Sequence, residues 1–128
     1  MKRLSGMLFS ETSGKKIIAK VRVADTSFKR FKGLMLERGK NFDYALVFLL
    51  PRETRAGASL HMLFVFFPID VLFLDAGKKV VDKATLHPWA LNYTPKKAAK
   101  FIVELPAGKA SQVKLGEKIG WKIKGQKI

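Results

Sequence analysis

The stretch LHMLFVFFPIDVLFLD, residues 60–75, decides how this chain folds. It is almost entirely large and apolar, but Pro68 and Asp70 interrupt it near its centre. A transmembrane helix needs about 20 consecutive apolar residues, and a carboxylate at the bilayer centre costs about 3 kcal/mol. Proline also lacks the N–H that a central strand requires. We therefore predict two buried strands, Leu60–Phe66 and Ile69–Leu74, joined by a bend, rather than a membrane span.

Short apolar runs separated by turn-forming residues predict further strands on both sides of this stretch. Near the N-terminus, two such runs flank the turn sequence ETSGKK, as expected of a β-hairpin. The run at residues 44–50 is continuously apolar, which is typical of a strand covered on both faces. The strands expected outside residues 60–75 are RLSGMLFS (3–10), IIAKVRVAD (17–25), YALVFLL (44–50), VVDKATL (80–86), FIVELP (101–106) and IGWKIK (119–124).

One amphipathic helix is expected between the hairpin and the third strand. Phe28, Phe31, Leu34 and Met35 recur at helical spacing, and the polar residues before them can cap a helix. The elements together predict an α+β fold that is mostly antiparallel β, a compact barrel-like sheet with one or two short helices. A length of 128 residues suits one domain, which we expect to span residues 1–128.

The composition is strongly basic. Twenty-five Lys and Arg against ten Asp and Glu give a net charge of +15, and 48% of the residues are hydrophobic. Such a charge attracts polyanions such as nucleic acid, although a lysine-rich surface is also typical of thermophiles. The chain has no cysteine, which excludes disulfides and thiolate chemistry. The opening residues contain no long apolar run, so we expect a soluble, cytoplasmic protein without a membrane span.

Asp70 is the first candidate for a functional side chain. It alternates with Ile69 and Val71, and therefore shares a strand face with Leu72 and Leu74. A carboxylate buried on that face needs a partner. An arginine of the preceding helical segment, Arg30 or Arg38, and backbone amides at the start of the strand are structural partners, and a binding or catalytic role is the alternative.

The two histidines, His61 and His87, are the other candidates for chemistry. His61 together with Asp70 is the catalytic pair that an enzyme hypothesis would use, because histidine titrates near neutrality. A metal site needs three or more well-spaced ligands, so we expect neither a metal nor a cofactor. No glycine-rich phosphate loop and no nucleophile motif is present, and the sequence does not favour an enzyme.

A nucleic-acid hypothesis rests on aromatic residues flanked by lysines. Aromatic side chains can stack on bases while neighbouring lysines contact phosphates. The opposing interpretation is that the tryptophans belong to the core. The residues that would carry this role are Trp89, Tyr93, Lys96, Lys97 and Lys100.

The order of several motifs resembles that of a known family. These motifs are GLMLER (33–38), YALVFLLP, LHMLFVFFPIDVLFLD, KVVDKATLHPW and FIVELPAGKASQVKLGEKIGW, and they extend from Phe28 to Trp121. The chain is similar to members of the DUF192 or UPF0127 family, of archaeal type. The resemblance implies a small, mostly β fold with a barrel-like core, but no function. Many members have Trp before the central Met and Lys-Asn after it, where this chain has His61, Leu63 and Phe64.

We interpret the chain as a small ligand- or partner-binding accessory module. The alternatives are a nucleic-acid-associated protein with a basic surface and an enzyme centred on His61 and Asp70. A binding pocket is expected near the bend at Pro68. Its expected lining is Met35, Arg38, His61, Met62 and Asp70.

Overall fold

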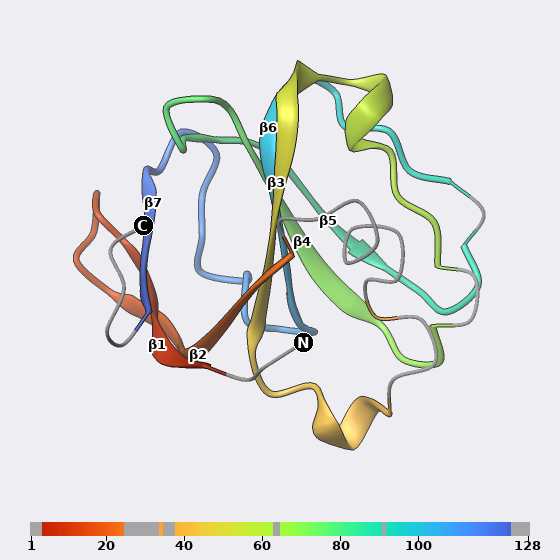
Figure 1. Ribbon diagram of the computed structural model, residues 1–128, viewed down its shortest axis with the longest axis horizontal. Coiled ribbons are helices and arrows are strands. Elements are labelled where there is room, and N and C mark those ends of the chain that lie inside the picture. Colours follow the sequence, from red (N-terminus) through yellow and green to blue (C-terminus); the bar gives the residue numbers. More distant parts are fainter. Residues whose placement is uncertain (1–3, 25–33, 35–37, 63–64, 91, 124–128) are drawn as a thin grey trace.

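The computed structural model describes residues 4–24, 34, 38–62, 65–90 and 92–123, which form a curled sheet of seven strands (Figure 1). The helical elements of these residues are two single 3-10 turns, η1 (Gly39–Asn41) and η2 (Ala56–Ala58). The strands are β1 (Leu4–Ser10), β2 (Lys16–Ala24), β3 (Ala45–Thr54), β4 (Ile69–Leu74), β5 (Val80–Leu86), β6 (Ala99–Pro106) and β7 (Ile119–Ile123).

The sheet is mixed, with the strand order β5-β4-β6-β3-β2-β1-β7. The pairing of β2 with β3 is parallel, and the other pairings are antiparallel. The two edge strands meet where each begins, through an antiparallel bridge between Lys79 and Lys118. Val80 N–H donates to Glu117 O, and Ile119 N–H donates to Lys78 O, each over 2.9 Å. These bonds join the edges at one end and account for the barrel-like curl.

Two apolar cores lie on opposite faces of this sheet. The inner core fills the curl and includes Leu8, Val47, Leu72 and Trp121. The outer core lies on the other face, where the segments between β2 and β3 and between β3 and β4 add Phe42, Met62 and Val65 to the sheet residues. Strand β4 is buried at all six positions, because its side chains alternate between the two cores. A polar side chain on β4 therefore has little contact with bulk water.

The predicted strand Leu60–Phe66 is wrong in the described part of that segment. Leu60 forms an isolated bridge with Tyr93, and the backbone of Met62 bonds to Trp89 and Ala90 instead of to a neighbouring strand. Residues 63–64 lie outside the described residues. The apolar run signals burial, which the outer core confirms, but it does not specify a ladder partner. In contrast, the strand predicted after the bend is β4, with the same bounds.

Other predicted boundaries can also be compared with the structure. The helix expected around Phe28 to Met35 lies outside the described residues, except Leu34, which is buried in the outer core. The strand predicted at residues 44–50 ends too early, because β3 continues through Pro51 to Thr54. No helix among the described residues is long and apolar enough to cross a membrane.

Gly6 is expected to be intolerant of any side chain. A Cβ atom on Gly6 would lie 2.0 Å from Lys122 O, within the β1–β7 pairing, where neither backbone can move without breaking the ladder. We predict that Gly6→Ala lowers the free energy of unfolding by about 3 kcal/mol, measured by urea denaturation. Gly14→Ala is the control: its φ is +77° but no atom lies nearby, so the loss should be about 1 kcal/mol. Equal losses would contradict the steric argument.

Candidate functional site

Residues 107–113, the first part of the β6–β7 connection, close one end of the curled sheet, and we call them the plug. Ala110 and Val113 are buried in the inner core, together with residues of β1, β2 and β7. In Figure 1 the plug belongs to the blue chain between β6 and β7. Each residue of the plug adopts a turn or an irregular conformation, so its backbone N–H groups need partners outside a strand ladder.

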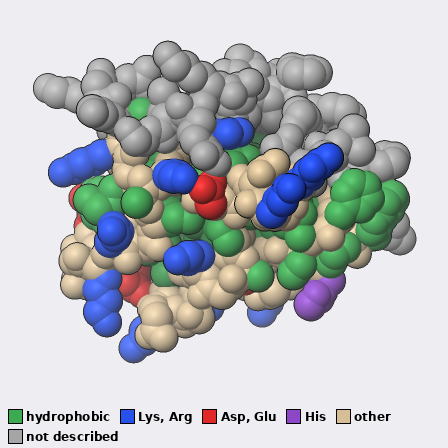
Figure 2. Space-filling view, turned by 90° about the horizontal axis from the view of Figure 1, so that it is seen from below, with side chains coloured by type: hydrophobic (Ala, Val, Ile, Leu, Met, Phe, Trp, Pro, Cys, Tyr) green, Lys and Arg blue, Asp and Glu red, His purple; other side chains and the backbone are tan. Residues whose placement is uncertain are grey.

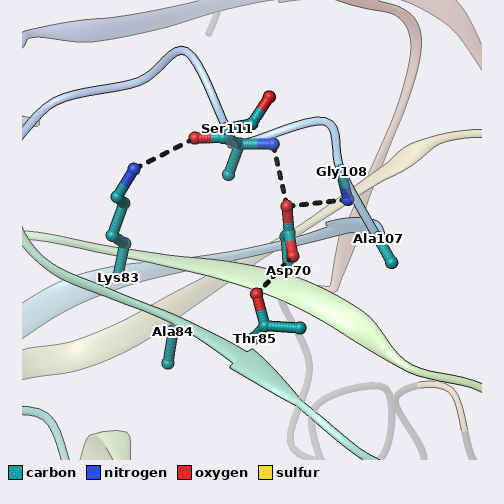
Figure 3. A pocket seen from close by; sticks show the side chains of 8 residues that line it. Asp70, Lys83, Ala84, Thr85, Ala107, Gly108 and Ser111 are labelled. Atoms are coloured by element: carbon teal, nitrogen blue, oxygen red, sulfur yellow. Dashed lines mark hydrogen bonds between the residues drawn. The ribbon is translucent and has the colours of Figure 1, made fainter.

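Asp70, the second residue of β4, accepts hydrogen bonds from two of these N–H groups. Its side chain points into the plug (Figure 3), where Oδ2 accepts hydrogen bonds from Gly108 N over 2.9 Å and from Ala110 N over 3.0 Å. Oδ1 accepts a third bond from Thr85 Oγ1 over 2.8 Å. Asp70 is 5% exposed, and bonds of this kind satisfy a buried carboxylate. The plug is thus attached to β4 by charge-assisted bonds.

Two further charged residues hold the plug and the chain that follows it. Lys83 Nζ, on β5, donates to Val113 O over 2.6 Å and to Ala110 O over 3.3 Å. Glu117 accepts hydrogen bonds from Ser10 Oγ and from Lys114 N. The bond from Ser10, the bond from Lys114 N and the positive charges of nearby lysines lower the pKa of Glu117. The connection is therefore held from β1, β4 and β5 together.

Two hollows lie on either side of the plug. The Asp70 hollow, between the plug and strands β4 and β5, has a volume of about 360 Å³ (Figure 3). The lysine hollow, between the plug and the β1–β2 hairpin, has a volume of about 230 Å³. Gly108 and Ser111 border both. The Asp70 hollow is lined by Asp70, Lys83, Ala84, Thr85, Ala107, Gly108, Ala110 and Ser111, and the lysine hollow by Ser10, Ser13, Lys15, Lys16, Ile17, Gly108, Lys109, Ser111, Gln112, Val113 and Glu117.

The described residues among those expected to line a pocket near Pro68 do not lie together. Asp70 pairs with Leu105 on the inner face of the sheet, whereas Met62 is buried in the outer core, so the sheet separates them. His61 is exposed within the segment that packs on the outer face, and it does not line the Asp70 hollow. Arg38 is exposed before η1, and Met35 lies outside the described residues.

The aromatic residues of the nucleic-acid hypothesis have different environments. Tyr93 stacks on Phe73 with ring centroids 5.6 Å apart, and its hydroxyl donates to Asp82 over 2.7 Å. Burial, that hydrogen bond and the charge of Asp82 raise the pKa of Tyr93 to about 12. Trp89, in contrast, is 47% exposed and lies 5.7 Å from the exposed ring of Phe66. Tyr93 is therefore part of the packing, and Trp89 is accessible.

The lysines of that hypothesis precede or begin β6. The backbone N–H of Lys96 donates to Asp82, while the side chains of Lys96 and Lys97 are exposed and Lys100 is half-buried. Figure 2 shows Lys and Arg side chains spread over the face in view and separated by hydrophobic and neutral groups, rather than gathered in one patch.

Glu104 is a carboxylate on the outer face of β6 that was not among the predicted site residues. Its neighbours in the ladder are Leu46 and Val71, and it is 7% exposed. No hydrogen bond from a described residue reaches it, and burial raises its pKa from the ordinary 4.5 to about 8. The signal in the sequence was a single Glu within the apolar run FIVELP. Such a group is neutral in the folded protein at pH 7.

Arg22 lies in the same row of the outer face, because β2 pairs it with Leu46. Its guanidinium lies 4.1 Å from the centroid of the Tyr44 ring, and its buried Nε has no hydrogen-bond partner among the described residues. Three or more His, Asp or Glu side chains that could hold a metal ion do not converge anywhere in the described part of the chain.

Residues 8–121 match the model of the DUF192 family, described as "Uncharacterized ACR". The chain is a member of the DUF192 family. The matched range begins in β1 and ends in β7, so it includes the plug, the described lining of both hollows and most of both cores.

Curated relatives in the family are UPF0127 proteins of thermophilic archaea. The protein of Thermococcus kodakarensis is 51% identical over 117 residues, which cover 90% of this chain and 73% of the relative. The protein of Pyrococcus abyssi is 45% identical over 118 residues, which cover 91% of this chain and 97% of the relative. Neither name states an activity.

Two solved bacterial structures share the fold. A protein of unknown function from Novosphingobium aromaticivorans has a TM-score of 0.73 at 20% identity, covering 93% of this chain and 85% of that one. A putative transcription regulator from Sinorhizobium meliloti has a TM-score of 0.76 at 18% identity, covering 98% and 96%. At this identity the likeness concerns the DUF192 fold and not its use.

Asp70 should act on stability through the plug. Asp70→Ala leaves the amides of Gly108 and Ala110 without acceptors, so we predict a loss of about 3 kcal/mol in the free energy of unfolding. Asp70→Asn keeps one oxygen for both amides, and the Thr85 hydroxyl can turn to accept, so about 1 kcal/mol should be lost. Urea denaturation measures both. Unchanged hydrogen-exchange protection of Gly108 and Ala110 in the alanine variant would contradict this role.

Glu104 should make stability depend on pH. Because its pKa rises from 4.5 to about 8 on folding, the unfolded chain releases the proton at a lower pH than the folded protein does. Stability should therefore fall as the pH rises from about 4.5 to about 8, by up to about 1.4 kcal/mol per pH unit. Glu104→Gln removes this slope and keeps the shape of the side chain. Urea denaturation of both proteins at several pH values tests this, and parallel profiles would refute it.

Proposed function

We propose that the protein is a binding module of a single domain, located in the cytoplasm, that captures a small polar ligand beside the plug. The observation that carries this proposal is the attachment of the plug by the buried Asp70 carboxylate, with a hollow on each side. Ligand sites are concave, largely pre-formed and frequent at the mouths of β-barrels. A loop held by charge-assisted bonds loses little conformational entropy when a ligand binds.

The chemistry of the lining favours a polar ligand over an apolar one. The Asp70 hollow presents the Lys83 ammonium together with the hydroxyls of Thr85 and Ser111, among small alanines. Its volume of about 360 Å³ lies at the lower end of the range for small-molecule sites, which begins near 300 Å³. A compact metabolite with hydrogen-bonding groups fits these conditions.

A second candidate, association with nucleic acid, is favoured by the exposed ring pair of Phe66 and Trp89 and by the net charge of +15. The Sinorhizobium meliloti neighbour, which shares the fold, is named a putative transcription regulator. Base stacking on Trp89 would place nucleic acid on a segment that lines neither hollow. The two candidates therefore depend on different residues.

A bulky side chain at the border of the two hollows should abolish ligand binding. Ser111 borders both hollows and is exposed, so the indole of Ser111→Trp would obstruct their shared border without disturbing the core. In a thermal-shift screen of polar metabolites, a ligand at 100 times its Kd stabilises the wild type by about 2.7 kcal/mol. We expect this stabilisation to disappear in Ser111→Trp.

Leu115→Trp is the matched control, because Leu115 is exposed on the same connection and lines neither hollow. It should respond to ligands as the wild type does. A ligand that stabilises Ser111→Trp fully would refute the proposed site. An oligonucleotide whose binding is lost in Trp89→Ala and kept in Ser111→Trp would instead support the second candidate.

A further inference from the structure

Positive charge converges on the lysine hollow. Lys15 and Lys16 come from the β1–β2 hairpin and Lys109 from the plug, while Glu117 is the one carboxylate among the described residues of the lining. No carboxylate of a described residue forms a salt bridge with any of the three lysines. A concave surface of one charge sign concentrates the field and attracts ions of the opposite charge.

Glu117 does not remove this positive character. One of its oxygens accepts from Ser10 Oγ over 2.6 Å, and the other accepts from Lys114 N. These bonds direct the carboxylate toward the walls of the hollow and hold it ionised, with its pKa lowered. Three positive charges against one negative charge therefore remain in the lining.

The lining also supplies neutral donors. The side chains of Ser13, Ser111 and Gln112 border the hollow, and the oxygen of Ser13 accepts from Lys15 N, so its proton is available to a ligand. Hydroxyl and amide donors next to ammonium groups are the usual surroundings of a bound phosphate. A surface of solvated lysines alone would not place such donors in one concavity.

Both sides of the hollow have a defined backbone. On the plug, Asp70 holds Gly108, whose φ is +94°. On the hairpin, Ser13 N donates to Ser10 Oγ over 3.1 Å, and Gly14 N donates to Ser10 O over 2.8 Å. The backbone positions that carry the lysines are thus set by the fold before any ligand arrives, which reduces the entropic cost of binding.

We propose that the lysine hollow binds the phosphate group of a small phosphorylated molecule. This inference rests on the proposed function, because it names the ligand class for one side of the plug. A volume of about 230 Å³ is below that of a typical site for a whole cofactor, so the hollow holds the phosphate and little more. The remainder of the molecule extends past Ser111, which borders the Asp70 hollow as well.

Calorimetric titration at constant ionic strength tests the proposal with inorganic phosphate, pyrophosphate and glycerol phosphate. Binding of phosphate and pyrophosphate should be saturable and at least tenfold weaker in the double variant K15A/K109A. The control K96A/K97A removes the same charge from exposed lysines that precede β6, whereas the plug follows its end, about 25 Å away. It should bind as the wild type does. Tighter binding of glycerol phosphate than of phosphate would identify an ester as the ligand.

Several outcomes would overturn the proposal. One is an equal loss of binding in both double variants, which would mean attraction by net charge alone. Another is a titration with sodium chloride that gives the same binding signal as the titration with phosphate. A third is displacement of phosphate by an oligonucleotide that binds K15A/K109A and K96A/K97A equally weakly. Neutral ligands that stabilise the wild type but not Ser111→Trp, with no binding of phosphate, would refute this inference and leave the proposed function intact. The urea midpoints of all variants, measured without phosphate, verify that they are folded.

Discussion

Burial of the central strands on both faces is the constraint on which the rest of this structure depends. Strand β4 has no exposed position, and its neighbour β6 is buried from Ile102 to Leu105. A carboxylate in this layer must either accept strong hydrogen bonds or remain protonated, since an ionised group without partners is too costly there. Asp70 takes the first course on the inner face, and Glu104 takes the second on the outer face. The two carboxylates are therefore accommodated in different ways.

The course that Asp70 takes determines the shape of the barrel end. Its bonds to Gly108 and Ala110 bring the β6–β7 connection across the opening, and Ala110 and Val113 then complete the inner core. A connection held at a few points cannot fill the whole opening, and the two hollows are the space that remains on either side. The candidate site is thus a consequence of how the inner core is closed.

Sequence patterns located the strands better than the site. The bounds of β4 and β5 were predicted because Pro68 and the turn after Leu74 delimit two apolar runs. Alternation also placed Asp70 on the face of Leu72 and Leu74, which is where it lies. Alternation cannot say which core a face belongs to, so it could not separate Asp70 from Met62. The sequence of residues 107–113 shows neither helical nor strand periodicity of its apolar residues. Only tertiary contacts reveal that these residues close the barrel.

Ten Asp and Glu cannot balance 25 Lys and Arg, and some of these carboxylates are held by backbone amides. Acidic groups that accept from backbone amides are held by the fold and are not free to follow lysine side chains. Besides Asp70, Asp82 accepts from the amides of Lys83 and Lys96, and Glu117 accepts from that of Lys114. Their negative charge still acts on nearby lysines, as the lowered pKa of Glu117 shows. In the lysine hollow the described lining still has three lysines against Glu117, so its potential is positive.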